Sequence, residues 1–233
     1  MKKNHKSSLV DNVSLPKKVG IIYSDVKQEY FPTKEQYLTE KDALNDARII
    51  SKYLEKFGIE TSLYPATPNL SQKLIKDKPN MVFNLTGSVR GLEYMAATIP
   101  GILEMHDIPY TGAGILGESL GYNKFLIKKL LEQHGVPVPN FQLFSNSNTP
   151  IDISLRFPLI SKLNEIHGAV EINQDAVSEN EKHLRERLKF LISTYKQPAL
   201  VEEFIVGKEE PANVPLEEPT ISVKVVPLAF LPL

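Results

Sequence analysis

Lysines and glutamates suited to holding a nucleotide flank the predicted elements in the second half of the chain. Lys124 begins a predicted helix just after a glycine-rich turn, and Lys162 ends a predicted buried strand. Two lysines from separate elements can hold a polyphosphate, and free backbone N–H groups at a helix start also attract anions. Glu202, Glu203 and Glu209 surround the end of another predicted strand. Because a carboxylate at that place can accept hydrogen bonds from ribose hydroxyls, these residues together predict a nucleotide site.

Each of these residues also has an ordinary structural explanation. Lys124 can be solvated, Lys162 can be a paired lysine at a strand end, and the two consecutive glutamates can form an exposed face. A lysine that ends a buried strand is costly, however, unless it has a partner. The combination of these residues, in this order along the chain, favours the nucleotide site over the separate explanations.

Other patterns weaken several alternative sites. The stretch GAGILG matches G-x-G-x-x-G, but it does not follow the first strand of a βαβ unit, and Glu132, near the required spacing, lies inside a predicted helix. The sequence contains no G-x-x-x-x-G-K-[ST] motif of a P-loop. Its five histidines show no metal-ligand spacing, and its lack of cysteine excludes disulfides, thiolate metal sites and a cysteine nucleophile.

The overall composition is that of an ordinary globular protein. The chain has 233 residues and a formal net charge of -1, so no global field favours nucleic acid or an anionic membrane. The basic start MKKNHKSS is followed by no apolar signal region, and no apolar run is long enough to span a bilayer. We therefore expect a cytoplasmic protein with neither nucleic acid nor a membrane as partner.

The first half of the chain predicts a parallel sheet flanked by helices. Strands are expected at KVGIIYS, IETSLYP and NMVFNL, separated by the helices EKDALNDARIISKYLEKFG and NLSQKLIKDK. This β-α-β-α-β order is typical of an open α/β domain. The apolar stripe expected on the longer helix comprises Ala43, Ala47, Ile50, Leu54 and Phe57.

Helices also dominate the segment that leads to the middle of the chain. LEYMAATIPGILEMHD predicts helix on both sides of Pro100, which starts a second helix or kinks the first. NKFLIKKLLEQHG predicts an amphipathic helix with Asn123 as its N-cap and Gly135 as its end. The sequence IPYTGAG between them predicts a strand and a glycine turn.

The second half predicts two strands around one long helix. The strands are FPLISKL and PALVEEFIVGKE, and the helix is SENEKHLRERLKFLISTYKQ. A capping box of Ser178 and Glu181 is expected to open that helix, with Leu184, Leu188, Leu191 and Tyr195 on one face. The predicted domains are a mobile lead-in at 1–17, an α/β domain at 18–135, a nucleotide-binding subdomain at 136–210, and a proline-rich tail at 211–233.

The order of motifs resembles the ATP-grasp ligases, and most closely the D-alanine–D-alanine ligases and their relatives. The resemblance rests on FNLTG, GILEMHDIPYTGAG, NKFLIKKLLEQHGVPVPNF, FPLISK and PALVEEFIVGKE, and it covers roughly Val19 to Glu209. It implies an N-terminal open parallel α/β domain, the pre-ATP-grasp domain, followed by an ATP-grasp α+β region in which ATP lies between two antiparallel sheets. The later segment that carries the family's Mg²⁺ ligands has no counterpart, so we expect this region to be incomplete and apparently truncated.

The resemblance also assigns roles to single residues that bind ATP. Lys124 and Lys162 match the two lysines that contact the ATP phosphates, although Leu163 follows where the family has proline. Glu202 opens the strand beside adenine, and Glu209 matches the glutamate that holds the ribose. The backbone hinge against adenine is matched by Glu203, Phe204 and Ile205.

Three further residues receive catalytic roles from the same resemblance. Glu93 stands for the acidic residue after the third strand, and Glu40 for the glutamate that binds the substrate amine. Gly168 lies in the loop NEIHGAVEI, which matches the lid over the phosphates. In that loop Gly168 and Ala169 stand where two serines are common, and Glu171 stands where glycine is common.

The chemistry that the resemblance implies is ATP-dependent joining of a carboxylate to an amine through an acyl phosphate. The expected partners are ATP, Mg²⁺ and a small amino acid such as D-alanine, and a homodimer is also expected. No metal ligand is assigned in this sequence. The alternative is an inactive, truncated ATP-grasp protein that binds nucleotide weakly or acts as a binding or dimerising module.

Overall fold

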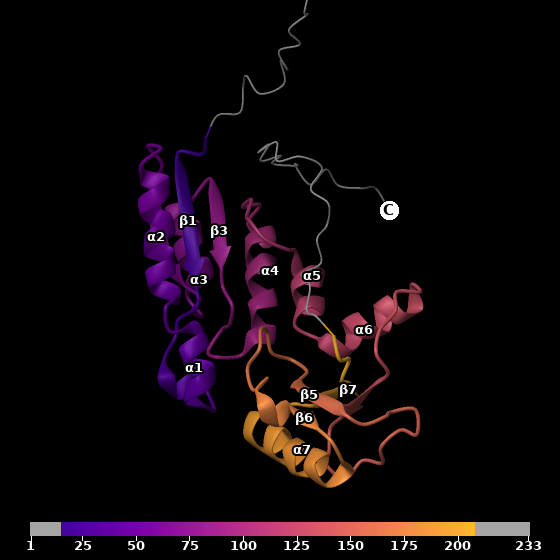
Figure 1. Cartoon of the computed structure of the whole chain (residues 1–233). Coiled ribbons are helices and arrows are strands. Elements are labelled where there is room, and N and C mark those ends of the chain that lie inside the picture. Colours follow the sequence, from indigo (N-terminus) through magenta and orange to yellow (C-terminus); the bar gives the residue numbers. More distant parts are fainter. Residues whose placement is uncertain (1–14, 208–233) are drawn as a thin grey trace, which may run out of the picture.

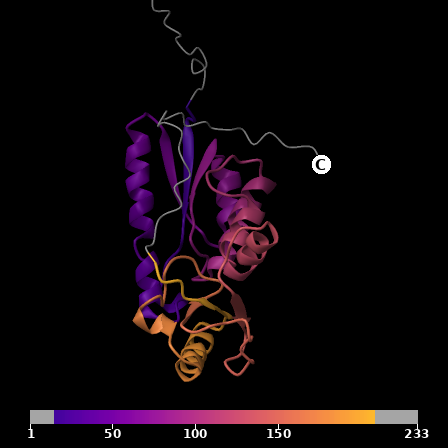
Figure 2. The same ribbon diagram turned by 45° about the vertical axis from the view of Figure 1, so that its right-hand side comes forward.

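A computed structural model describes residues 15–207 of the chain, and it contains two sheets. Strands β1 to β3 form a three-stranded parallel sheet in the order β2-β1-β3, and β4 to β7 form a four-stranded sheet in the order β4-β7-β5-β6. Figures 1 and 2 show the two sheets one above the other, with α7 beyond the second sheet. This arrangement confirms the predicted α/β fold class, with a parallel first part and an antiparallel second part.

The parallel sheet is built from the three strands that the sequence predicts. Their bounds are Lys18–Tyr23 for β1, Glu60–Pro65 for β2 and Met81–Leu85 for β3. Apolar side chains bury one face of this sheet against α3 (Leu70–Asp77) and α4 (Thr98–Met105). Helix α2 (Ala43–Glu55) lies on the other side, as Figure 2 shows. Because the strands are parallel, Ser24 and the segment 86–88 meet at the carboxyl end of the sheet.

Five more helices lie in the chain before the second sheet. They are η1 (Gln28–Tyr30), α1 (Lys34–Glu40), η2 (Glu93–Ala97), α5 (Ile115–Gly121) and α6 (Lys124–Gln133). Asn123 caps α6, because its side-chain oxygen accepts a hydrogen bond from the N–H of Leu126 at 3.0 Å. Gly135 follows α6 with a φ of 74°, a left-handed conformation that glycine adopts readily. The predicted start and end of this helix are therefore confirmed.

The second sheet has one face on a hydrophobic core and one face toward α6. Its elements are β4 (Phe141–Phe144), β5 (Leu159–Leu163), η3 (Gln174–Ala176), β6 (Val177–Ser178), α7 (Glu181–Tyr195) and β7 (Ala199–Glu203). Side chains alternate between the faces of a strand. Leu159 and Leu163 of β5 thus pack with Leu184 and Leu188 of α7, whereas Lys162 of β5 lies on the other face.

Two local predictions in the first half are refined by the structure. Phe57 is 71% exposed, because α2 ends at Glu55 and the chain turns at Gly58, so Ile59 is buried in its place. The predicted apolar stripe is wrong at that position. Pro100 lies in the first turn of α4, which begins directly after η2. A proline is tolerated there because the first N–H groups of a helix lack intrahelical partners.

The predicted capping box of α7 is wrong. Ser178 belongs to β6, where it pairs with Leu159, so its backbone is part of a strand three residues before the helix begins at Glu181. Asn180 caps α7 instead, and its side-chain oxygen accepts a hydrogen bond from the N–H of His183 at 3.0 Å. Because Ser178 is part of strand β6, the N-cap of α7 lies two residues later than predicted.

This difference predicts unequal effects of two substitutions. Replacing Asn180 with alanine should lower the free energy of unfolding by about 1 kcal/mol, because an N-cap hydrogen bond is lost. Ser178→Ala is the matched control, since the buried Ser178 hydroxyl has no hydrogen-bond partner within the described structure and its removal should cost little. Urea unfolding of the full chain measures both values. A larger loss of stability for Ser178→Ala than for Asn180→Ala would show that Ser178, and not Asn180, caps the helix.

Candidate functional site

A buried glutamate on the open face of the second sheet is held between two lysines. The Glu202 side chain is 5% exposed, and one of its oxygens contacts Nζ of Lys162 from the adjacent strand β5. Nζ of Lys128, from α6, lies 2.6 Å from the other oxygen. The two ammonium groups lower the pKa of Glu202 against the opposing effect of its burial. The site therefore contains a stable carboxylate with two cations on the face that the sequence predicts to hold phosphates.

Lys124 joins this cationic face from the first residue of α6. The start of α6 is attached to the loop after β5, because the N–H of Lys124 donates to the Asn164 carbonyl at 3.1 Å and the N–H of Phe125 donates to the Asn164 side chain at 2.9 Å. The Lys124 ammonium donates to the carbonyl of Ile166 in the same loop. Burial lowers the pKa of Lys124, and the nearby Lys162 charge adds to this effect. Lys124 lies one helical turn before Lys128, which shares the Glu202 carboxylate with Lys162, so α6 brings Lys124 to the same side of the second sheet.

Two glutamates of the first part of the chain form an acidic pocket on the other side of this loop. Glu93, at the start of η2, accepts a hydrogen bond from the N–H of His167. Glu40, at the end of α1, accepts a hydrogen bond from the Ser88 hydroxyl at 2.6 Å. Gln36 lies one helical turn before Glu40 and is also buried. We call Gln36, Glu40 and Glu93 the acidic pocket.

Burial makes the charged forms of both glutamates unfavourable. The pKa of Glu93 is raised to about 7, mainly by desolvation; the Glu40 charge contributes to the rise, and the His167 N–H and the Lys124 charge oppose it. Burial likewise raises the pKa of Glu40, against hydrogen bonds from Ser88 and Ser24. A positively charged ligand would stabilise both carboxylates in their ionised form.

A cavity of about 230 Å³ opens beside the acidic pocket. It is lined by Gln36 and Glu93 on one side and by Glu165, Ile166 and Tyr195 on the other. The side-chain oxygen of Gln36 and one oxygen of Glu40 are buried without a hydrogen-bond partner within the described residues. Oxygens of this kind accept hydrogen bonds, so the pocket has the chemistry to bind an ammonium group.

The predicted adenine hinge follows β7, and part of its backbone is already engaged. The N–H of Glu203 donates to the Asn140 carbonyl and that of Phe204 donates to the Pro158 carbonyl, each at 3.0 Å. The Glu203 carboxylate accepts from the Asn140 side chain at 3.2 Å. The side chain of Ile205 is exposed. Glu209, the predicted ribose ligand, lies outside the described residues.

The loop after β5, residues 164–172, differs from a simple lid. Gly168, to which the resemblance gave a catalytic role, has a φ of 72° and an exposed position with free space around its Cα. Glu171 also has a positive φ, of 61°. Its carboxylate accepts from the Tyr195 hydroxyl at 2.7 Å and lies 3.4 Å from the buried guanidinium of Arg187. Glu171 is therefore attached to α7, and these contacts offset the unfavourable backbone conformation.

Several residues of the site were not identified from the sequence. Lys128 lies four residues after Lys124, so both occupy one face of α6, and this spacing could have pointed to it. Gln36 and Arg187 gave no such signal, because a glutamine and an arginine in amphipathic helices are ordinarily exposed. Within residues 15–207 no three histidine, aspartate or glutamate side chains lie together as a metal site.

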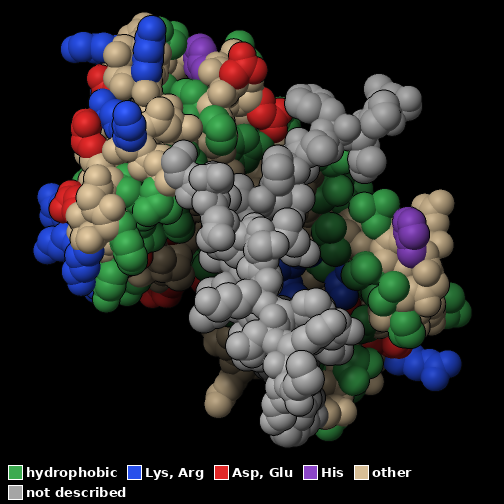
Figure 3. Space-filling model, turned by 90° about the horizontal axis from the view of Figure 1, so that it is seen from above, with side chains coloured by type: hydrophobic (Ala, Val, Ile, Leu, Met, Phe, Trp, Pro, Cys, Tyr) green, Lys and Arg blue, Asp and Glu red, His purple; other side chains and the backbone are tan. Residues whose placement is uncertain are grey.

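Helices α5 and α6 expose apolar side chains among polar ones. Leu116 of α5 and Leu126 and Leu130 of α6 are exposed, and Figure 3 shows that hydrophobic side chains form part of the molecular surface. Lys124 and Lys128 extend instead from the side of α6 that faces the second sheet. No helix within the described residues is long and apolar enough to cross a membrane.

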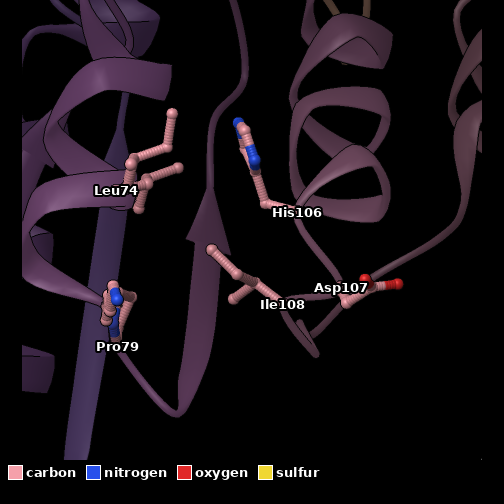
Figure 4. Close-up of a pocket in the computed structure, with 7 residues that line it drawn as sticks. Leu74, Pro79, His106, Asp107 and Ile108 are labelled. Carbon is pink, nitrogen blue, oxygen red and sulfur yellow. The ribbon is translucent and has the colours of Figure 1, made fainter.

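A second cavity, of about 350 Å³, lies at the opposite end of the parallel sheet from the acidic pocket. Figure 4 shows Leu74 of α3 facing His106 and Ile108, which follow α4, across this space. The side chain of His106 is hydrogen-bonded to Ser71 at 2.8 Å. Because none of the candidate residues lines it, we place the functional site at the other end of the molecule.

Comparison with curated proteins finds relatives among ligases. No family model matches the chain. It is 35% identical over 164 residues to the uncharacterized protein y4sG of Sinorhizobium fredii, which covers 67% of this chain and 47% of that protein. It is 31% identical over 205 residues to a D-alanine–D-alanine ligase of Carboxydothermus hydrogenoformans, which covers 84% of this chain and 60% of the ligase. The chain thus spans less than two thirds of either relative.

Comparison with solved structures also finds D-alanine–D-alanine ligases, here by similarity of fold. The D-alanine–D-alanine ligase of Bacillus anthracis complexed with ATP superimposes with a TM-score of 0.62 at 20% identity, covering 83% of this chain and 58% of that one. The enzyme of Helicobacter pylori gives a TM-score of 0.56 at 18% identity, covering 83% and 65%. The chain is therefore an ATP-grasp protein related to the D-alanine–D-alanine ligases.

Proposed function

We propose that the chain carries the ATP-binding part of an ATP-dependent carboxylate–amine ligase that acts on D-alanine or a similar amino acid. The sequence relationship to D-alanine–D-alanine ligases supports the ligase class. The amino acid, the acyl-phosphate route and the roles of single residues remain proposals, because the chain spans 60% of the ligase that it matches over 205 residues.

The observation that carries the proposal is the juxtaposition of a cationic face and an acidic pocket across one short loop. The carbonyl of Ile166 binds Lys124, and the N–H of the next residue, His167, binds Glu93. On the cationic side, Lys128, one helical turn after Lys124, shares the Glu202 carboxylate with Lys162. An amino acid carries an ammonium and a carboxylate a few bonds apart, so it can place its ammonium in the acidic pocket and its carboxylate toward the lysines.

In this arrangement the side chains act mainly by positioning and by neutralising charge. Lys124 and Lys162 would bind ATP phosphates, which brings the γ-phosphorus next to the substrate carboxylate. The carboxylate oxygen attacks that phosphorus and ADP leaves, which forms an acyl phosphate. The amine of a second amino acid then attacks the acyl carbon, loses a proton and displaces phosphate. Mg²⁺, when bound, would neutralise the phosphate charge, and we assign it no ligand in the described residues.

The test is phosphate release by the full chain with ATP and Mg²⁺ across a panel of D- and L-amino acids. The proposal predicts release that requires one of the amino acids and falls when Lys162 is replaced by methionine. Lys189→Met is a matched control, because Lys189 is exposed on α7, on the other side of the second sheet. Phosphate release that is independent of every amino acid, or its absence throughout the panel, would contradict the ligase proposal.

A second candidate is a protein that binds nucleotide without ligating. It is favoured by the internal partners of both lysines, since Lys162 contacts Glu202 and Lys124 binds the Ile166 carbonyl in the structure. ATP must displace these contacts, which weakens binding. Saturable ATP binding without amino-acid-dependent phosphate release would select this candidate. For both candidate functions, a homodimer of this chain remains a prediction.

A further inference from the structure

Lys162 cannot contact both Glu202 and a phosphate without a change in the ion pairs on this sheet face. Glu202 is almost fully buried, and Lys162 contacts one of its oxygens. A buried carboxylate that loses its counter-ion is strongly unfavourable, because neither water nor another charge replaces the lost interaction. If Lys162 is to bind phosphate, as the proposed function requires, another cation must neutralise Glu202 when the Lys162 ammonium moves away.

Lys128 is placed to provide that neutralisation. Its ammonium lies 2.6 Å from the Glu202 oxygen that Lys162 does not contact. The side chain is 18% exposed and also lies over the Phe141 ring of β4, with 5.9 Å between Nζ and the ring centroid. Lys162 is somewhat more exposed, at 25%. Lys128 is thus the more enclosed of the two partners of Glu202.

The helix that carries Lys128 is fixed at its start. The Asn164 side chain accepts from the N–H of Phe125 and donates to the side chain of Asn123 at 3.3 Å. The ring of Phe125 packs edge-on against Phe141, with centroids 5.7 Å apart. Because one end of α6 is held against the second sheet by these contacts, Lys128 can keep its contact with Glu202 while the Lys162 side chain moves.

We propose that Lys128 is a positioning residue, a fixed counter-ion of Glu202 that frees Lys162 to bind the ATP phosphates. This role rests on the proposed function and deepens it. Lys128 acts through Glu202 and Lys162 and makes no contact with the nucleotide. Its removal should leave Lys162 as the only neutralising partner of Glu202 among the described residues, so that ATP must then compete with a buried carboxylate for this lysine.

The test is ATP affinity, measured by calorimetry on the full chain at a temperature where each variant is folded. Lys128→Met should raise the dissociation constant by about tenfold or more, because a buried charge pair must break on binding. Lys128→Arg, which keeps the charge, should stay near the wild-type value. Lys129→Met is the matched control, since this neighbouring lysine is half-exposed and pairs with Glu132.

A double-mutant cycle separates this role from direct contact and from a structural role. Glu202→Gln removes the buried charge, so Lys128→Met should change ATP affinity by less than about twofold in that background. An equal loss of affinity in both backgrounds would show that Lys128 contacts ATP or only supports the fold, and would overturn the inference. Unchanged affinity of Lys128→Met in the wild-type background would also overturn it. A wild-type chain that binds no ATP would remove the proposed function itself.

If Lys128→Met does not fold, Lys128→Gln decides the matter. The glutamine amide can still donate a hydrogen bond to Glu202 but carries no charge, so this variant should also bind ATP about tenfold or more weakly than the wild type. Unchanged ATP affinity of a folded Lys128→Gln variant would overturn the inference.

Discussion

Replacing Lys162 with methionine should raise the dissociation constant for ATP about a hundredfold, which corresponds to about 2.7 kcal/mol. Lys162 is the second-last residue of β5 and lies on the sheet face away from the hydrophobic core, where it and Lys128 of α6 both contact Glu202. An ammonium that binds phosphate in a partly buried site contributes a strong charge-assisted hydrogen bond. Methionine keeps most of the apolar length of the side chain and removes the charge, so the loss reports on the interaction with the nucleotide.

The fold should tolerate this substitution. Glu202 retains Lys128 at 2.6 Å when Lys162 is lost, so the buried carboxylate keeps one counter-ion. Calorimetric titration with ATP gives the affinity, and circular dichroism of the same samples checks the fold. Lys189→Met on the far side of the second sheet should bind ATP as the wild type does. A folded Lys162→Met variant with wild-type affinity would remove Lys162 from the site.

Replacing Glu93 with glutamine should stabilise the ligand-free protein above neutral pH and leave its stability nearly unchanged at mildly acidic pH. Burial raises the pKa of Glu93 from 4.5 to about 7. The folded state therefore binds the proton more tightly than the unfolded state. The resulting stability is present in full below about pH 4.5 and is lost as pH rises through about 7. Glutamine is neutral throughout, so it avoids this loss.

The size of the effect follows from the difference in pKa. A rise of this magnitude corresponds to about 3 kcal/mol in the free energy of unfolding at about pH 8.5. Glutamine can still accept the hydrogen bond from the His167 N–H, so the comparison isolates the charge. Urea unfolding between about pH 5 and about pH 8.5 measures the difference. Glu132→Gln, at a half-exposed position, is the control. A stability difference that does not change with pH would refute the raised pKa.

Hydrophobic pattern and turn chemistry were enough to predict the fold class and the strands that carry the site. Strand β5 follows from FPLISKL and β7 from PALVEE, because alternating side chains bury one face against α7. Asn123 and Gly135 were predicted as the limits of α6 from local chemistry alone. These features depend on neighbouring residues, and so the sequence reveals them.

Features that depend on distant contacts were not predicted. Ser178 was chosen as the cap of α7, but its pairing with Leu159 in β6 moves the cap to Asn180. Glu171 stands where glycine is common in the loop matched to the lid, and its contacts with Arg187 and Tyr195 of α7 were not foreseen. Whether a charged side chain faces a ligand or a partner is decided by tertiary packing, which spacing along the sequence does not show.

In the candidate site, too, local features were predicted and contacts between distant residues were not. Lys124 and Lys162 were predicted together from the ends of their elements, and their joint role in binding phosphate stays a prediction. In the structure Lys124 lies one helical turn before Lys128, which shares the Glu202 carboxylate with Lys162. The actual contacts of the two predicted lysines, Ile166 and Glu202, were not foreseen, because they arise from the way α6 lies against the second sheet. The domain boundary near Gly135 stays a prediction, since α6 precedes it yet contacts the second sheet through Lys128.

Hydrogen exchange of the full chain, measured with and without ATP and Mg²⁺, tests the position of the nucleotide most directly. The proposed site predicts slower exchange on ATP binding at the start of α6, along β5 and the following loop, and at the end of β7. These three segments carry Lys124, Lys162 and Glu202 and meet on one sheet face. Protection confined to the cavity beside His106, or no protection at all, would contradict the assignment of this face as the ATP site.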